Sequence, residues 1–312
     1  MRYEIVTYKS ALILILIVVL HCFYQSTAFA VTFTDEIGRR VNITPAPQRI
    51  VSLAPGITET LFALGLHAEI AGVTTFCDWP ETARAKTRIG GFTNPSIEKI
   101  VSLKPDLIIA TADGNRKDTV DKLERIGLPV YVIKPSDMDG ILASILHIGE
   151  ITNRTRTAGK LVKTLQNRLD SINAQIKGKN KPRVFFQIGL EPLITVGGGT
   201  LIHEVVERAG GINIAGNDTA RYPRYGAEGV MSGAPDIILF APMAHDKEFK
   251  AVKSFWRKIG GVPAVKNNQI YPIDTDLIGR ASPRVFDAIE IMALIFHPDI
   301  KIANNGKEKK LR

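Results

Sequence analysis

Short apolar runs alternate with amphipathic segments along most of the chain. The runs at 49–53, 106–110 and 129–133 are rich in Ile, Val and Leu and are only four or five residues long, which is typical of strands buried on both faces. The segments 58–65 and 118–127 have apolar residues at helical spacing, and each ends in a glycine. This alternation of strand and helix predicts a parallel sheet covered by helices, an α/β fold.

The same order of elements starts again in the second half of the chain. Residues 183–189 form a second apolar strand pattern, and 200–211 form a second amphipathic helix pattern. Further on, residues 254–265 (SFWRKIGGVPAV) parallel residues 121–132 (DKLERIGLPVYV). The sequence therefore predicts two similar α/β lobes.

One segment is repeated closely enough to be recognised by eye. IEKIVSLKPDLIIA in the first half matches AEGVMSGAPDIILFA in the second. Glu98 stands eight positions before Asp106, and Glu228 stands eight positions before Asp236. A proline precedes each aspartate and an apolar run follows it, so we expect a helix, a turn and a strand in both copies.

The helix of the first copy has a recognisable start signal. Asn94 is a residue that commonly caps helices, and Pro95 follows it directly. Because proline is favoured at the first helical position, we expect Asn94 as the N-cap and Pro95 as the first residue of the helix.

The segment between the two halves reads as one long helix. Residues 155–178 contain no proline and carry an apolar stripe at helical spacing, formed by Ala158, Leu161, Val162, Leu165, Leu169 and Ile172. About 25 helical residues would span roughly 35 Å. We therefore expect a stiff connection with limited hinge motion and a cleft between the lobes.

The N-terminus has the pattern of a secretory signal peptide. Basic Arg2 and Lys9 precede an apolar stretch, and small residues end in an A-x-A site at Ala28–Ala30. The apolar stretch is shorter than the roughly 20 residues of a spanning helix. We expect cleavage after Ala30 and export to the periplasm, in preference to an uncleaved anchor or a lipid-modified Cys22.

These patterns divide the chain into six parts. We predict a signal peptide at 1–30, an N-terminal hairpin at 31–48, a first lobe at 49–150, an interlobe helix at 151–178, a second lobe at 182–298 and a basic tail at 299–312. The formal net charge is +9, but the basic residues are dispersed except in the tail, so we expect a solvated surface and no nucleic acid partner.

Cysteine usage gives one further constraint. The chain has two cysteines, and cleavage would remove Cys22 and leave Cys77 as the one thiol. An intramolecular disulfide is then excluded, so the stability of the exported chain must come from its core.

Several segments together resemble one known family. DEIGRRV, PQRIVSLAPGITETLFALG, GVTTFCDWP, IGGF, IEKIVSLKPDLIIA and RASPRVFDA occur in the order found in the helical-backbone (class III) periplasmic binding proteins of ABC importers, and they are most similar to the vitamin B12 (cobalamin)-binding members. The resemblance covers residues 32–298. It implies two Rossmann-like lobes joined by a single long backbone helix, with the ligand held between them.

The resemblance also gives the repeated glutamates a role. In this family one surface glutamate on each lobe docks onto one half of a permease dimer, which works with an ATPase; the matching residues here are Glu98 and Glu228. A pseudo-twofold protein presenting one carboxylate on each side suits a twofold partner. The alternative is that each glutamate only stabilises a helix N-terminus. The matched spacing in both lobes favours docking.

A set of ligand contacts follows from the resemblance. Phe76 and Phe92 match aromatic positions that stack on the ligand in B12-binding relatives, and Tyr222 matches another in the second lobe. Thr111 and Leu277 stand where relatives have tryptophans, so this pocket is less aromatic. A further contact loop matches Asp276, Leu277, Ile278, Gly279 and Arg280. Flat apolar walls suit a rigid metal macrocycle.

Other residues keep alternative readings open. Cys77 and His245 are candidate metal-facing groups, His245 as an axial ligand to cobalt or iron, although a buried thiol and an exposed loop histidine are the favoured interpretations. Arg224 lies between Tyr222 and Tyr225, which would suit an anionic ligand. Haem and ferric siderophores therefore remain alternatives to cobalamin.

An enzyme is the rival class. The glycines at Gly197–Gly199 follow a strand and precede a helix, as a phosphate-binding loop would, but the Lys-Ser/Thr of a P-loop is missing. We expect these glycines to allow a tight turn beside the cleft. The sequence thus predicts a monomeric binding protein that is not an enzyme, with no cofactor of its own and a cobalamin-like cargo.

Overall fold

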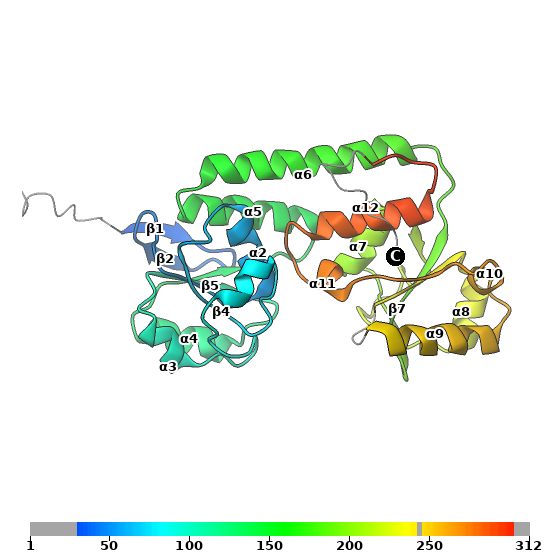
Figure 1. The fold of residues 1–312 in the computed structure, drawn as a ribbon, viewed down its shortest axis with the longest axis horizontal. Coiled ribbons are helices and arrows are strands. Elements are labelled where there is room, and N and C mark those ends of the chain that lie inside the picture. The colour runs from blue at the N-terminus through cyan, green and yellow to red at the C-terminus, as the bar shows by residue number, and fades with distance from the viewer. Residues whose placement is uncertain (1–29, 242–244, 303–312) are drawn as a thin grey trace, which may run out of the picture.

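The computed structural model describes residues 30–241 and 245–302, so the predicted signal peptide and most of the predicted basic tail lie outside the described residues. Figure 1 shows two α/β lobes side by side, with helix α6 (Thr155–Ile176) running along one edge of both. Within the described ranges, every helix is too short or too polar to cross a membrane.

The first lobe is built on a four-stranded parallel sheet. Its strand order is β4-β3-β5-β6. Strands β3 and β5 are parallel, and Ile50 of β3 pairs with Leu107 of β5. Buried residues fill both faces of β3, β5 and β6, as expected of strands covered on two sides. The elements of this lobe are β3 (Ile50–Ser52), α2 (Pro55–Ala63), β4 (Ile70–Val73), a 3-10 helix η1 (Glu81–Ala85), α3 (Ile97–Ser102), β5 (Leu107–Thr111), α4 (Lys117–Arg125) and β6 (Val130–Ile133).

The second lobe contains a mixed five-stranded sheet. Its order is β11-β10-β7-β8; β9 also pairs with β7, and β8 is antiparallel to β7. Its elements are β7 (Arg183–Leu190), β8 (Leu193–Thr195), α7 (Leu201–Arg208), β9 (Ile212–Asn213), α8 (Ala227–Gly233), β10 (Ile237–Phe240), α9 (His245–Ile259), α10 (Pro263–Lys266), β11 (Ile270–Pro272), α11 (Thr275–Ile278) and α12 (Val285–Phe296).

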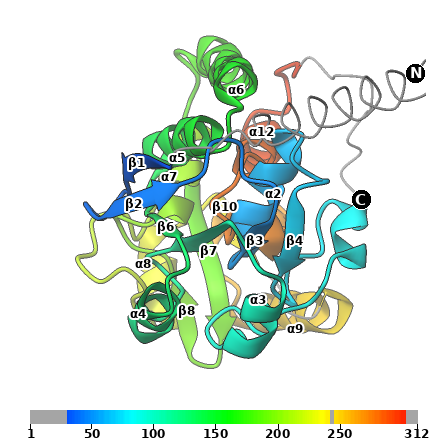
Figure 2. The ribbon, with the colours of Figure 1, turned by 90° about the vertical axis from the view of Figure 1, so that its left-hand side faces the viewer.

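An antiparallel hairpin precedes the first lobe. Strands β1 (Val31–Thr34) and β2 (Arg40–Ile43) pair with each other. The buried Asp35 carboxylate accepts hydrogen bonds from the Arg39 guanidinium at 2.6 Å, and Arg39 also donates to the carbonyl of Val130 at 3.1 Å. The hairpin is thereby fixed against the edge strand β6 (Figure 2).

Helix α6 connects the lobes. Helix α5 (Met138–Ile151) ends the first lobe, and α6 packs along it and along α12. The buried positions of α6 are Ala158, Val162, Leu165, Leu169 and Ile172, which belong to the apolar stripe seen in the sequence. Beside this stripe, Arg168 donates to Asp287 and Glu290 of α12, both at 2.6 Å. Helix α6 is thus held along its length, which limits bending.

The repeated sequence segment forms the same corner in both lobes. The Asp106 carboxylate accepts from the backbone N–H of Arg49 at 2.8 Å, and the Arg49 guanidinium donates to the carbonyl of Leu103 at the end of α3. In the second lobe Asp236 accepts from the N–H of Arg183 at 2.8 Å, and Arg183 donates to Gly233 at the end of α8. In each lobe the aspartate therefore holds the backbone at the start of the strand, and the arginine at that position holds the end of the helix.

Two local expectations were wrong. Helix α3 is capped by Ser96, whose hydroxyl accepts from the N–H of Lys99 at 3.2 Å, while Pro95 pairs with Gly90 in an isolated bridge. Asn94 and Pro95 therefore precede the helix. The parallel between 121–132 and 254–265 also ends early, because the second segment closes with helix α10 where the first has strand β6.

Candidate functional site

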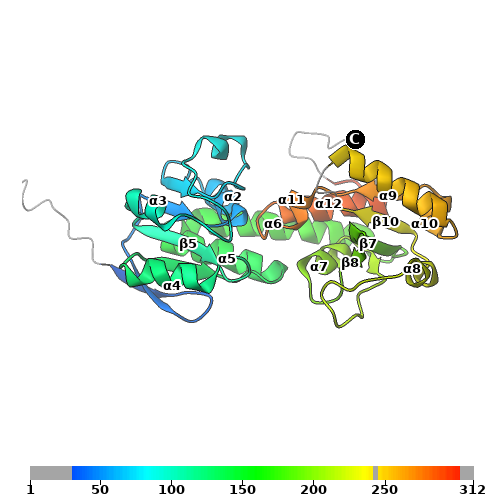
Figure 3. The same cartoon turned by 90° about the horizontal axis from the view of Figure 1, so that it is seen from below.

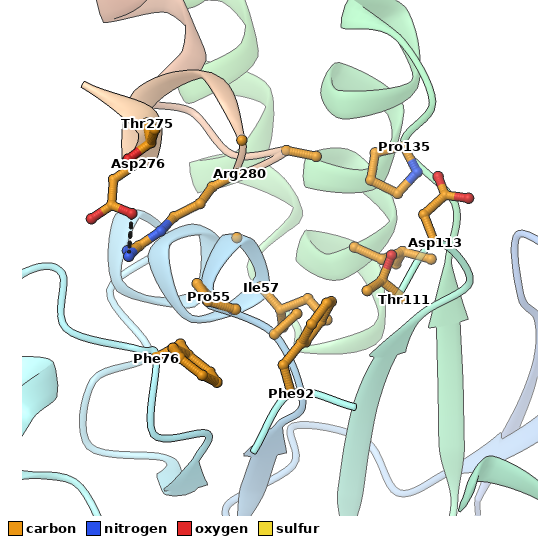
Figure 4. A pocket seen from close by; sticks show the side chains of 15 residues that line it. Pro55, Ile57, Phe76, Phe92, Thr111, Asp113, Pro135, Thr275, Asp276 and Arg280 are labelled. Carbon is orange, nitrogen blue, oxygen red and sulfur yellow. Dashed lines mark ion pairs between the residues drawn. The ribbon is translucent and has the colours of Figure 1, made fainter. Parts of the chain in front are cut away.

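A pocket of about 460 Å³ opens between the two lobes. Its walls come from the loops after β3, β4 and β5 in the first lobe and from the region of α11 in the second. Figure 4 shows Phe76 and Phe92 on one side, Arg280 with Asp276 across from them, and Thr111, Asp113 and Pro135 on a third side. The carboxyl ends of parallel strands are the usual binding edge of an α/β sheet.

Phe92 is held in place by two neighbours from another loop. The buried side chain of Asn115 donates to the carbonyls of Phe92 and Leu53, both at 2.9 Å, and accepts from the N–H of Thr111 at 2.8 Å. The Phe92 ring lies directly against Gly114, where an added Cβ would stand 1.9 Å from the ring. The Asn115 amide therefore joins three loops of the pocket, and Gly114 leaves the space that the Phe92 ring occupies.

Phe76 projects from a loop that is anchored on its other side. Cys77 is fully buried, with its sulfur 3.1 Å from the hydroxyl of Thr74. The Arg88 guanidinium donates to the carbonyls of Thr74 and Cys77, both at 2.8 Å. With Cys77 turned into the core, Phe76 is left 58% exposed at the pocket. Cys77 does not line this pocket.

Arg280 is surrounded by three carboxylates. Its guanidinium lies 2.8 Å from Asp78, 2.8 Å from Asp276 and 3.0 Å from Glu59. Burial alone would lower the pKa of Arg280, but the hydrogen bonds to Asp78 and Glu59 raise it above its usual value. Burial likewise opposes ionisation of Asp78, yet the Arg280 guanidinium lowers the pKa of Asp78 below its usual value. Both groups are charged at neutral pH.

Glu59 was not predicted from the sequence, and it joins the two lobes. It comes from α2, is almost fully buried, and accepts from Ser282 at 2.6 Å and from Arg284 at 3.1 Å in addition to Arg280. Beside it, an added Cβ on Gly56 would meet the carbonyl of Ala281 at 2.6 Å. The signal in the sequence was a lone acid in an otherwise apolar and small helix pattern, which requires a buried partner.

The structure brings some predicted ligand residues together and separates others. Those that line the pocket are Phe76, Phe92, Asp276, Gly279 and Arg280. Leu277 and Ile278 instead pack into the hydrophobic core, because α11 turns them inward. Tyr222 is 53% exposed and lies outside this pocket.

The other chemistry-bearing candidates have structural positions. His245 is the first residue of α9, and its side chain lies outside the described residues. An added Cβ on Gly197 would stand 2.1 Å from the carbonyl of Ala220, and one on Gly198 would stand 2.5 Å from that of Gly216. Close backbone packing therefore explains the glycine cluster. In the described ranges, His, Cys, Asp and Glu side chains do not gather in threes as a metal site would need.

The two repeated glutamates occupy equivalent, exposed places. Glu98 is the second residue of α3 and Glu228 is the second residue of α8. Figure 3 shows both helices on the side of the molecule seen from below, diagonally opposite each other. Hydrogen bonds from its own backbone N–H and from the Ser96 hydroxyl lower the pKa of Glu98, so this carboxylate is ionised at neutral pH.

Basic residues also gather outside the tail, contrary to the expectation from the sequence. A shallow hollow of about 380 Å³ on α9 is lined by Lys250, Lys253, Ser254, Arg257 and Lys258. Helical spacing brings these residues to one face, which the linear sequence did not make evident.

The fold agrees with comparisons to known proteins. The family described as periplasmic binding protein matches residues 50–277, and the chain belongs to this family. A vitamin B12-binding protein of Vibrio campbellii is 30% identical over 242 residues, covering 78% of this chain and 86% of that protein.

Two solved structures extend the comparison. The periplasmic vitamin B12-binding protein of Vibrio cholerae is 29% identical with a TM-score of 0.69, covering 80% of this chain and 97% of that one. The periplasmic haem-binding protein of Roseiflexus sp. RS-1, in its apo form, is 25% identical with a TM-score of 0.70, covering 80% and 98%. The fold is thus shared by binding proteins for different metal macrocycles.

Proposed function

We propose that this protein captures a corrinoid, cobalamin, in the pocket between its lobes. The observation that carries the proposal is the charge of the pocket. Among the described residues that line it, Arg280 is the one cation, and three carboxylates already surround it. Haem carries two propionates, which need cations to replace their lost hydration. The side chains of cobalamin end in amides, which do not require that compensation.

The remaining walls are suited to a rigid ring. The pocket is also lined by the apolar side chains of Phe76, Phe92, Pro55, Ile57 and Pro135. Burial of a preformed macrocycle against apolar walls gains hydrophobic free energy with little ordering cost. A corrinoid is larger than the pocket, so the bound ligand would extend toward the second lobe.

Haem is the second candidate, and one observation favours it. Arg221, Tyr222 and Arg224 are all exposed in the second lobe, where the two cations are available to propionates.

Titration calorimetry with cyanocobalamin, dicyanocobinamide, haemin and ferrichrome in parallel distinguishes the candidate ligands. We expect the two corrinoids to bind and haemin and ferrichrome to bind weakly; tight haemin or ferrichrome binding without corrinoid binding would reject cobalamin as the ligand.

A single substitution tests the location. Phe92→Ala should weaken cobalamin binding by about 1–3 kcal/mol, the scale of one lost aromatic contact. An unchanged dissociation constant would count against this pocket.

The exported, monomeric protein would deliver its ligand to an ABC importer and would catalyse no reaction. The resemblance and the twofold placement of Glu98 and Glu228 support docking on a permease dimer with its ATPase. Glu98→Ala combined with Glu228→Ala should leave cobalamin affinity unchanged and abolish uptake. Glu150→Ala with Asp170→Ala removes two exposed carboxylates from α5 and α6 and should leave uptake intact. Loss of ligand affinity in the first variant would refute the docking role.

A further inference from the structure

An exposed apolar side chain stands at the same place in each copy of the repeat. Val101 lies three residues after Glu98, and Met231 lies three residues after Glu228. Both side chains belong to residues that are 43% exposed. The residues just before them, Ile100 and Val230, are fully buried. Each short helix therefore packs one apolar residue inward and turns the next one out to solvent.

A single exposed hydrophobic residue needs no explanation in a soluble protein. Here the exposure is duplicated at matching positions 130 residues apart, next to the one acid that is also duplicated and exposed. Not every position of the two helices is kept alike, since Lys99 matches Gly229 and Leu103 matches Gly233, although the exposed Ser102 matches Ser232. The acid and the outward-facing apolar residue are thus both present in each copy, while other surface positions differ.

The two members of each pair lie on the same side of their helix. Residues three apart are neighbours on a helix surface. The acid and the apolar side chain of α3 thus form one small patch, which we call patch 1 (Glu98 and Val101), and those of α8 form patch 2 (Glu228 and Met231). Figure 3 shows α3 and α8 diagonally opposite each other, with α4 and α9 on the other diagonal. This is the arrangement of a pseudo-twofold surface.

We infer that Val101 and Met231 form the apolar half of two equivalent docking patches. Each patch fits a site that offers a cation beside an apolar side chain, once on each half of a twofold-symmetric membrane permease. An apolar contact next to an ion pair excludes water and strengthens the pair. This inference rests on the proposed function and adds to it the residues that would shield the glutamates.

The test compares binding to the permease–ATPase complex of the same organism in lipid nanodiscs, measured by biolayer interferometry. Val101→Thr combined with Met231→Gln keeps similar volumes but makes both positions polar. We expect affinity for the complex to fall about tenfold per patch, with cobalamin titration and thermal melting unchanged. The matched control is Val31→Ser with Ile37→Ser, since both residues are 46% exposed but lie in the N-terminal hairpin; it should bind as the wild type does.

Two outcomes overturn the inference. One is wild-type affinity of the Val101→Thr, Met231→Gln variant for the complex. The other is a wild-type dimer in sedimentation experiments that this variant abolishes, because a second copy of the chain would then be the occupant of the patches. Failure of the proposed function looks different: cobalamin fails to bind the wild type, or Glu98→Ala with Glu228→Ala binds the complex normally.

Discussion

Glu59 in the first lobe and Arg280 in the second form an ion pair of 3.0 Å beside the pocket, which Arg280 lines. Glu59 also pairs with Arg284, whose guanidinium lies over the ring of Trp79 at 4.3 Å. The lobes are therefore joined at the ligand pocket as well as through α6. Because one buried carboxylate serves two partly buried guanidinium groups, we expect its loss to affect this network most.

Removing that charge should destabilise the protein. Glu59→Gln leaves Arg280 and Arg284 without their shared buried carboxylate, and we expect a loss of about 2–4 kcal/mol in the free energy of unfolding, measured by urea denaturation. Asp78→Asn serves as the control, because the Asp78 side chain is 42% exposed and should contribute less than about 1 kcal/mol. Equal stability of the Glu59 variant and the wild type would contradict the structural role.

The repeated aspartates should matter more than other acids. Asp106→Ala removes acceptors for the N–H groups of Gln48 and Arg49, so we expect a loss of about 1–3 kcal/mol in unfolding free energy. Asp121→Ala breaks an exposed ion pair with Lys117 and should change stability by less than about 0.5 kcal/mol. Similar effects of the two substitutions would show that the hydrogen bonds of Asp106 stabilise the fold no more than an exposed ion pair does.

A glycine should stabilise the turn that follows each repeated helix. Lys104 and Ala234 both adopt the left-handed conformation, with φ of 46° and 41°. Ala234→Gly should raise the unfolding free energy by up to about 1 kcal/mol, because glycine has no Cβ penalty there. The same change at exposed Ala251 inside α9 should lower it by about 1 kcal/mol. Thermal melting that moves both variants in the same direction would refute this account.

Two exposed aromatic residues in one loop should differ in ligand binding. Phe76 is 58% exposed and lines the pocket, whereas Trp79 is 50% exposed and packs on Arg284 outside it. We expect Phe76→Ala to weaken cobalamin binding by about 1–2 kcal/mol in calorimetry and Trp79→Ala to leave it nearly unchanged. The reverse order would place the ligand on the other side of the Glu59 network.

Stability should fall on mild acidification because of His297. This residue is 4% exposed, and burial lowers its pKa below the usual value near 6.5. Below about pH 6.5, His297 therefore binds a proton more readily in the unfolded chain than in the folded chain. The contribution is fully present above about pH 6.5 and is lost as the pH falls toward the lowered pKa of the folded state, with a slope of at most about 1.4 kcal/mol per pH unit.

Urea denaturation between pH 8 and pH 5.5 measures that slope. His297→Gln should flatten it, while His67→Gln, at an exposed position, should keep the wild-type slope. An unchanged slope in the His297 variant would show that this histidine does not couple protonation to folding.

Local pattern was sufficient for much of the fold. Apolar runs at 49–53 and 106–110 became β3 and β5, and the stripe from Ala158 to Ile172 became the buried face of α6. The repeat around Glu98 and Glu228 likewise indicated equivalent helix–turn–strand corners. These features depend on residues close together in sequence, for which periodicity and turn chemistry are informative.

Only the tertiary structure decided how the site is assembled. The pairing of Glu59 with Arg280 joins residues 221 positions apart, and Asn115 bonds to Leu53 across 62 positions. Periodicity carries no information about such contacts, because they depend on how the lobes pack. For the same reason, the sequence placed Leu277 and Ile278 among the ligand contacts, whereas the rotation of the single turn α11 directs both into the core.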